Sequence, residues 1–479
     1  MHHEVKQDSD VHSTVNAHYD AIVIGAGYPG LIAGAILSRN GLKTVVLDEL
    51  DQIGERFGNT FMNGYWLDWG HRDAREIYSD NYLVMTRPNE FGKKAAEAAG
   101  AQISLVGPIL PTVKVHRTNG KIVAFTGDEQ SFVEFCTGVL DLPPEKVKSF
   151  AGLMGALGQE DEQKYMNLTM GEWLAGKADS DVHNAFARVA QIHYARPVEG
   201  NSVGRWIHSI KNPVDIYKVN DPEVGGLQGV HEAYARVIRK HGGEISLGLQ
   251  PVEITLKNGK VAGVVARDKS QTVREYHAPV VVFTLPFWEV FEVVDEGLFP
   301  AGVVENAKLV KKWYTRGDMA GLNIGVSRLP TIRATGKTED YMGWNQFTEH
   351  LADGWYVPTL SSAKQAPPGK HMINILAGTH DTFGSWEKVK ARLHAVKDYM
   401  NRYYSDLEAI TEWENYQWLR IWGTSAYWGP VTKGPLQVPG LDGLFFAGAT
   451  VEAAGQFEDI EANSALQVTK LILQRCIRR

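Results

Sequence analysis

Cysteine is scarce in the 479-residue sequence, which contains only Cys136 and Cys476, far apart in the chain. Two such cysteines cannot build a disulfide framework or a cysteine zinc site, and their scarcity fits a reducing compartment. No metal site is therefore predicted. Runs of 18 apolar residues without a charge are also missing, so no transmembrane helix is expected. The most apolar stretch, Pro279–Pro300, holds four acidic residues and is expected to cross a protein core.

A basic excess is missing as well, because 56 acidic residues outnumber 49 basic ones and give a formal charge of −7. This balance argues against a nucleic-acid partner. The first 18 residues are polar and lack the apolar segment of a signal peptide, so we predict a disordered arm over residues 1–18. We expect a cytoplasmic protein, with a peripheral membrane contact left open.

The strongest local signal is a glycine-rich turn between an apolar strand and a helix. Ala21–Ile24 predicts a short buried strand, and Leu31–Arg39 continues as a helix. Between them, Gly25, Ala26, Gly27 and Gly30 give the pattern GxGxxG. The first glycine of this pattern permits the tight turn, the second allows a pyrophosphate to approach, and the third lets helix and strand pack closely. The phosphates would lie at the positive N-terminus of the helix.

A second strand supports this interpretation. Lys43–Leu47 is apolar, follows Gly41 as a helix end, and leads directly into Asp48, 23 positions after Gly25. This spacing is close to that of the acid which binds the ribose hydroxyls in dinucleotide-binding folds. The sequence therefore predicts a dinucleotide site at this turn.

Two segments that follow indicate which dinucleotide is bound. Asp51–Arg56 reads DQIGER and Gly64–His71 reads GYWLDWGH. They resemble the DxxGGR and GxxxDxG elements of the flavoprotein superfamily that contains amine oxidases and phytoene desaturases. The resemblance implies FAD as cofactor, Arg56 at its pyrophosphate and Gly70 near the flavin ring. Glu55 departs from the pattern by replacing the second glycine.

The resemblance continues through the middle and the end of the chain. Gly225–Pro286 matches the superfamily's second nucleotide-binding segment, with a hairpin turn at Asn258-Gly259, and implies that the Val252 backbone pairs with adenine. Pro439–Gly448 matches its last strand, and a final helix over Phe457–Leu473 implies that Gly448 and Phe457 lie at the flavin. Ala449 and Asp459 depart from the residues usual there.

The resemblance spans Tyr19 to about Ile472 and predicts an α/β fold. This fold has a Rossmann-type FAD-binding domain, in the layout of p-hydroxybenzoate hydroxylase, with an inserted α+β substrate domain. The predicted FAD-binding domain comprises residues 19–72, 225–290 and 434–479, and the substrate-binding domain comprises residues 73–224 and 291–433. Helical patterns are predicted within 132–195 and over Trp386–Tyr403.

The resemblance also bears on the reaction. Ser361–His371 is similar to a stretch of phytoene-desaturase-like proteins that ends in APPGKH. Amine oxidases usually carry a lysine in the strand that corresponds to Ala320–Val326, and this strand has none. We therefore favour a desaturase or dehydrogenase that removes a hydride from a C–H bond of a small or isoprenoid-like substrate. A flavin amine oxidase and a non-catalytic escort protein of prenylated GTPases are the alternatives.

His71 and Arg72 are the candidate catalytic residues. They follow the GxxxDxG element, and histidine titrates near neutrality, so the pair suits a base or an anion-binding group. A structural pair bonded to Asp68 or Asp73 is the alternative. The electron acceptor (oxygen, a quinone or another acceptor) and the oligomeric state stay open.

Overall fold

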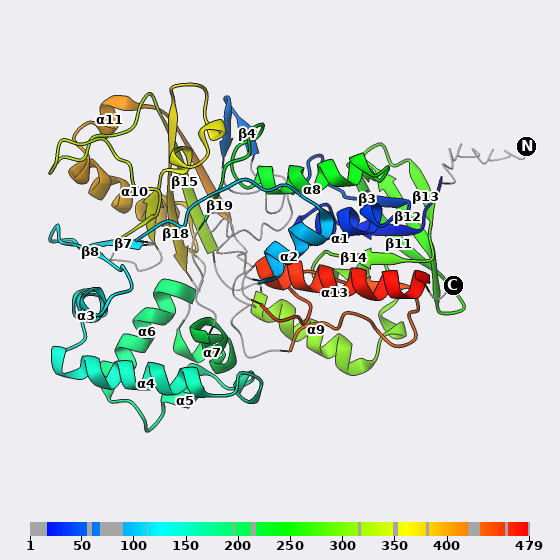
Figure 1. Ribbon diagram of the computed structural model, residues 1–479, viewed down its shortest axis with the longest axis horizontal. Coiled ribbons are helices and arrows are strands. Elements are labelled where there is room, and N and C mark those ends of the chain that lie inside the picture. Colours follow the sequence, from blue (N-terminus) through cyan, green and yellow to red (C-terminus); the bar gives the residue numbers. More distant parts are fainter. Residues whose placement is uncertain are drawn as a thin grey trace, which may run out of the picture.

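The computed structural model describes residues 17–54, 60–67, 90–111, 113–194, 197–211, 217–314, 318–347, 353–379, 383–419, 432–455 and 458–477. Figure 1 shows three regions: a sheet flanked by α1, α8 and α13, a second sheet beside α10, and a group of helices from α3 to α7. The first region carries the glycine-rich turn.

The first sheet has five strands, which are all parallel. In spatial order they are β10 (Glu244–Ser246), β3 (Thr44–Leu47), β2 (Ala21–Ile24), β14 (Val281–Phe283) and β20 (Leu444–Phe446). Alternate residues of the strands enter two different cores, because successive side chains point to opposite faces. The sheet is assembled from the three predicted segments of the chain, and its parallel strands confirm the predicted α/β fold class.

Helices cover one face of this sheet. They are α1 (Tyr28–Arg39), α2 (Glu90–Ala99), α8 (Gln228–Lys240) and α13 (Glu458–Ile477). Val23, Val46 and Val282 pack against them. A buried α1 explains why its sequence is apolar on all sides, since only Arg39 among its twelve residues is exposed.

A four-stranded sheet and further helices cover the opposite face. Its strands are β1 (Ala17–His18), β13 (Val273–His277), β12 (Lys260–Asp268) and β11 (Leu249–Lys257). The hairpin at Asn258-Gly259 is confirmed: both residues have positive φ, +54° and +72°, as a type I′ turn requires. Ala17 and His18 pair with β13, so these two residues of the predicted arm form a strand.

Two helices pack against the parallel sheet, although their residues fall within the predicted substrate domain. Phe91, Ala95 and Ala99 of α2 lie in the core formed with α1 and α13. Val304 and Val310 of α9 (Ala301–Tyr314) lie in the core on the other face of the parallel sheet. Both helices therefore belong with the nucleotide-binding sheet, although the sequence places them in the substrate domain. An amphipathic helix shows which side is apolar but not which sheet it covers.

The second large sheet has seven strands. In spatial order they are β19 (Thr411–Leu419), β15 (Asp318–Val326), β18 (His371–Thr379), β17 (Asp353–Tyr356), β16 (Trp344–Phe347), β7 (Val113–His116) and β8 (Ile122–Ala124). Helix α10 spans Trp386–Tyr403 as predicted, and with the short α11 (Leu407–Ile410) it packs on one face of the sheet. The hairpin of β4 (Thr60–Met62) and β5 (Tyr65–Leu67) contacts the other face through Met372.

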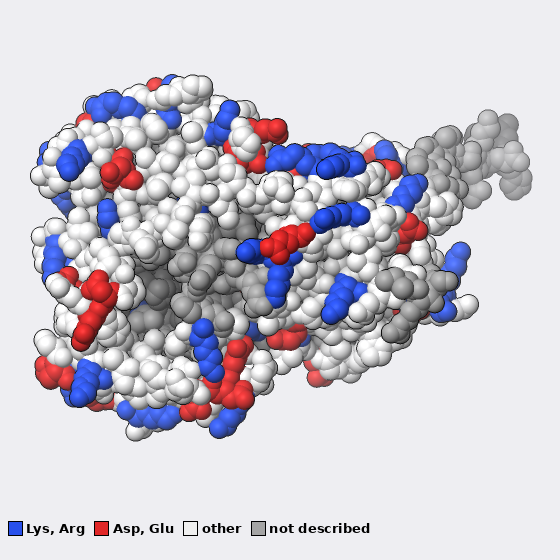
Figure 2. Space-filling view, viewed as in Figure 1, with Lys and Arg blue, Asp and Glu red and all other residues white. Residues whose placement is uncertain are grey.

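The remaining helices form a separate core. They are α3 (Glu129–Gly138), α4 (Val147–Gln159), α5 (Met170–Leu174), α6 (Ser180–Tyr194) and α7 (Val203–Lys211). The predicted helical pattern within 132–195 is thus confirmed. Two short strands, β6 (Leu105–Val106) and β9 (Lys218–Val219), pair with each other, and Leu105 and Val219 pack into the core between the parallel sheet and its helices. Figure 2 shows a hollow between helices α3 to α7 and the seven-stranded sheet, with basic and acidic side chains intermingled around it. Among the described residues, no helix is long and apolar enough to cross a membrane.

Candidate cofactor and substrate site

The glycine-rich turn joins β2 to α1 at the carboxyl edge of the parallel sheet. Gly25 has φ +106°, and a methyl group at Gly30 would lie 1.9 Å from the Gly25 carbonyl oxygen. Gly27 differs, because a Cβ there would meet only Pro29 among the described residues, at 4.0 Å. Gly25 is thus required by its backbone conformation and Gly30 by close packing, while the turn at Gly27 is open to a phosphate group.

Thr284 fixes this turn from the neighbouring strand. Its Oγ1 donates a hydrogen bond to the Ile24 carbonyl at 2.8 Å and would lie 2.5 Å from a Cβ at Gly25. Thr284 could not be recognised as a site residue from the sequence. The contact depends on β14 lying next to β2, a neighbour that is distant in sequence.

Asp48 lies at the end of β3, beside the turn. Its Oδ2 accepts a hydrogen bond from the Ala26 N–H at 2.5 Å, and its Oδ1 accepts one from the Leu50 N–H at 2.9 Å. These two bonds orient the carboxylate, whose oxygens are of the acceptor type that ribose hydroxyls need. The structure thus brings Gly25, Ala26, Gly27, Gly30 and Asp48 together.

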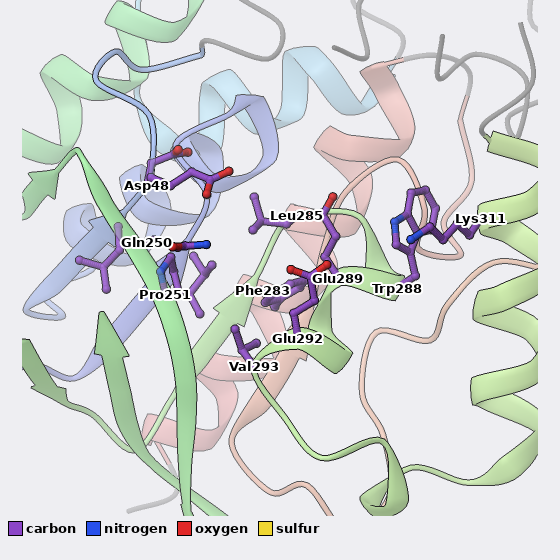
Figure 3. A pocket seen from close by; sticks show the side chains of 14 residues that line it. Asp48, Gln250, Pro251, Phe283, Leu285, Trp288, Glu289, Glu292, Val293 and Lys311 are labelled. Atoms are coloured by element: carbon purple, nitrogen blue, oxygen red, sulfur yellow. The ribbon is translucent and has the colours of Figure 1, made fainter. Parts of the chain in front are cut away.

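A cleft of about 760 Å³, open to solvent, continues from Asp48 along the carboxyl ends of β2, β3 and β14. Figure 3 shows Asp48 and Gln250 on one side and Leu285 and Glu292 on the other. Ligands of doubly wound folds bind at this edge of the sheet. The position suits the adenosine half of a dinucleotide.

Val252 lies beside this cleft at an irregularity of β11. The pairing with β12 passes from Pro251–Ala266 to Glu253–Val265, so Val252 is an extra residue of a β-bulge. The extra residue of a bulge is left out of the hydrogen-bond ladder. Its backbone groups are therefore suited to pair with a purine edge, as the resemblance implied.

The C-terminal strand brings Gly448 to the same turn. Gly448 has φ +129°, and a Cβ there would meet Pro29 of α1 at 3.9 Å. Its N–H donates to Ser464 Oγ of α13 at 2.9 Å. Nearby, Asp459 Oδ1 accepts from the Gly92 N–H of α2 at 2.8 Å. The start of α13 is thus fixed to the turn and to α2.

His231 of α8 is a further buried group that the sequence analysis missed. A Cβ at Gly54 would lie 2.1 Å from His231 Nδ1, which explains the glycine of the DQIGER segment. Among the described residues neither ring nitrogen of His231 has a hydrogen-bond partner, and burial lowers its pKa to about 4. A neutral His231 thus packs directly against the segment that leads to Arg56.

Buried charges occupy the junction of α7 and α13. Arg205 lies 3.7 Å from Glu452, while Lys433 and Glu461 are buried close by. Burial raises the pKa of Glu461 and lowers that of Lys433, and both shifts favour the neutral forms.

Five of the predicted site residues, Arg56, Gly70, His71, Arg72 and Phe457, lie outside the described residues. Their roles stay predictions.

Comparisons with known proteins agree with this geometry. The sequence model of a family described as flavin containing amine oxidoreductase matches residues 115–459. A chloroplastic prolycopene isomerase of an Oncidium hybrid cultivar is 23% identical over 413 residues, covering 79% of this chain and 67% of the relative. The neurosporene-forming phytoene desaturase of Rhodobacter capsulatus is 24% identical over 284 residues, covering 52% and 50%.

Solved structures show the same fold. Putrescine oxidase bound to putrescine superposes with a TM-score of 0.61 at 15% identity, covering 97% of this chain and 100% of that chain.

Proposed function

The chain belongs to the flavin-containing amine oxidoreductase family and is a FAD-dependent oxidoreductase, and from this premise we propose that it is of the desaturase or dehydrogenase type. Its substrate would be a small or isoprenoid-like organic compound that loses a hydride from a C–H bond.

The composition of β15 carries this proposal. The strand reads Ala320-Gly-Leu-Asn-Ile-Gly-Val326 and lacks the lysine that amine oxidases usually have there. The prolycopene isomerase and phytoene desaturase relatives and the APPGKH stretch support the same branch.

The described residues fit the adenosine and pyrophosphate parts of FAD. We propose that Gly27 and the start of α1 hold the pyrophosphate, that Asp48 binds the ribose, and that Val252 pairs with adenine. Gly448 and Phe457 would lie toward the flavin. When bound, FAD supplies the hydride acceptor, and the protein contributes orientation, electrostatics and exclusion of water.

His71 and Arg72 stay proposed as the residues that bind or deprotonate the substrate. Replacing either with alanine should lower kcat, because positioned acid–base groups contribute about 10²–10⁴-fold to the rate. Unchanged turnover in both variants with FAD fully bound would refute these roles. We also propose a cytoplasmic location.

A flavin amine oxidase is the second candidate, favoured by the family's own description and by the fold shared with putrescine oxidase. The two candidates differ in what reduces the bound flavin under anaerobic conditions. Compounds with an activated CH–CH pair should bleach the visible bands, whereas primary and secondary amines should not. Rapid bleaching by amines alone would overturn the proposed reaction in favour of the amine oxidase.

A further inference from the structure

Asparagines occur at the same level on three neighbouring strands of the seven-stranded sheet. Asn323 of β15 pairs with Asn374 of β18 on one side and with Asn415 of β19 on the other. Asn374 in turn pairs with Tyr356 of β17. Residues paired in this way point to the same face of a sheet. We call these four residues the amide row. They are Asn415, Asn323, Asn374 and Tyr356, and they lie side by side on four neighbouring strands.

The amide row lies on the face away from α10. Leu322 and Ile324, the neighbours of Asn323 in sequence, lie in the core with α10, so Asn323 points to the opposite face. On that face Asn415 Nδ2 lies 3.7 Å from Met62 Sδ of the β4–β5 hairpin. This hairpin follows the DQIGER segment in the chain.

Asn323 is fully buried yet unsatisfied. Its exposed fraction is 0%, and among the described residues neither its amide nitrogen nor its amide oxygen has a hydrogen-bond partner. The Asn415 amide oxygen is in the same condition. A buried polar group without a partner destabilises a fold, so such a group calls for an explanation beyond packing. Because the group offers both a donor and an acceptor, a single partner that satisfies both of its ends has to accept and to donate.

The surroundings of the row indicate the charge of that partner. Lys218, which is 7% exposed, places its Nζ 5.0 Å from the centre of the Tyr356 ring. A buried cation at one end of the row disfavours an ammonium group there. Aromatic side chains border the row, since Trp344 lies 6.0 Å from Tyr356 between ring centres, and a Cβ at Gly325 would meet Trp413.

We propose that the amide row binds the substrate through an uncharged group that both donates and accepts hydrogen bonds, such as a carboxamide or a hydroxyl, and that it discriminates against ammonium compounds. Asn323 makes the central contact and acts as a specificity-determining residue. This inference rests on the proposed function, because it names the substrate class of the same enzyme.

The first test compares two buried asparagines in the FAD-loaded protein. Asn345 of β16 is also 0% exposed, but it lies on the α10 face and is partly satisfied: its Oδ1 is 2.9 Å from His116 Nε2, while its Nδ2 has no partner among the described residues. The variant N345V should lower the melting temperature, because it breaks a buried hydrogen bond. The variant N323V should leave the melting temperature unchanged or raise it, because it removes an unsatisfied group. The alanine pair N323A and N345A gives the same comparison if the valine is too large.

The second test measures binding of benzamide and benzylammonium, which share a ring but differ in the group that they present. Flavin difference spectra and shifts in melting temperature report binding without turnover. Benzamide should bind wild type and N345V alike and N323V about tenfold more weakly, the loss of about one hydrogen bond. Benzylammonium should bind all three proteins more weakly than benzamide binds wild type.

Three results would overturn the proposal. One is a melting temperature of N323V and N323A as low as that of the Asn345 variants, which would indicate a structural role such as holding an internal water. Another is benzamide binding that is absent or insensitive to N323V. The third is tighter binding of benzylammonium. None of these three results depends on which compounds reduce the flavin. A failure of the proposed reaction is therefore distinguished from a failure of the proposed binding by the anaerobic reduction experiment.

Discussion

At the scale of single residues, Gly30 shapes the turn and Asp48 lies beside it, and both are proposed to hold the cofactor. Replacing Gly30 with alanine should abolish retention of FAD during purification, because the new methyl would lie 1.9 Å from the Gly25 carbonyl and the turn would have to open. Gly152→Ala in α4 is the matched control, since a Cβ there meets nothing within 4 Å. The flavin-to-protein ratio measures the effect, and a G30A protein that keeps a full complement of FAD would contradict the role of the turn.

Asp48→Ala should weaken FAD binding about 10- to 100-fold, equivalent to about 1–3 kcal/mol for lost hydrogen bonds to a buried or charged partner. Asp20 provides a control away from the cleft, because its Oδ2 also accepts a hydrogen bond from a backbone N–H, that of Lys43, at 2.8 Å. Titration of the apoprotein with FAD should show weaker binding for D48A and unchanged binding for D20A. Equal affinities of the two variants would refute the ribose role of Asp48.

Site residues that lie close to one another in the chain could be predicted from the sequence. The GxGxxG turn and Asp48 are separated by one helix and one strand, so their spacing alone brings them together. Thr284, the contact of Gly54 with His231 and the amide row could not be predicted in this way. Each depends on which strands or helices become neighbours and in what register, and a single sequence does not state that register.

At the scale of secondary-structure elements, buried histidines couple stability to pH. His231 joins α8 to the Gly54 turn, and His116 joins β7 to Tyr399 of α10 through a contact of 3.2 Å. Burial lowers the pKa of both to about 4 from an ordinary value of 6.5. Between these values the unfolded chain binds more protons than the folded one, so stability present above pH 6.5 is lost as the pH falls through about 4.

The two histidines should therefore lower the free energy of unfolding between pH 6.5 and 4, by at most about 3 kcal/mol for each at 1.36 kcal/mol per pKa unit. Glu461, whose pKa burial raises to about 8, contributes in the opposite direction, so the histidine contribution is measured as a difference between wild type and variant. His231→Leu should reduce the slope in this interval, because it removes one of the two groups. Urea titrations at several pH values measure it. Identical slopes for wild type and H231L would contradict a buried, neutral His231.

Elements with strong local signals match the structure well. Helix α10 begins and ends where its periodicity predicts, because Ser385 caps its N-terminus through a hydrogen bond from the Lys388 N–H. Helices α2 and α9 pack into the cores on the two faces of the parallel sheet, which could not be predicted because their patterns show an apolar side but not its partner. The sequence thus defines elements better than the layers into which they assemble.

At the scale of the whole molecule, a parallel nucleotide-binding sheet stands beside a second sheet, which carries the amide row on its face away from α10. The β4–β5 hairpin joins the two, since its chain leaves the glycine-rich region and packs on Met372 of the second sheet. A cofactor held by the first sheet and a substrate held by the second would then meet near this hairpin. This arrangement is the reason to expect one active site shared by both units.

Binding of FAD is the central claim, and the visible spectrum of the purified protein tests it most directly. Flavin bands that bleach with dithionite and return in air are the predicted result, with a return within seconds indicating oxygen as the acceptor and a slow return indicating another acceptor. A colourless protein that also fails to take up added FAD would contradict the account.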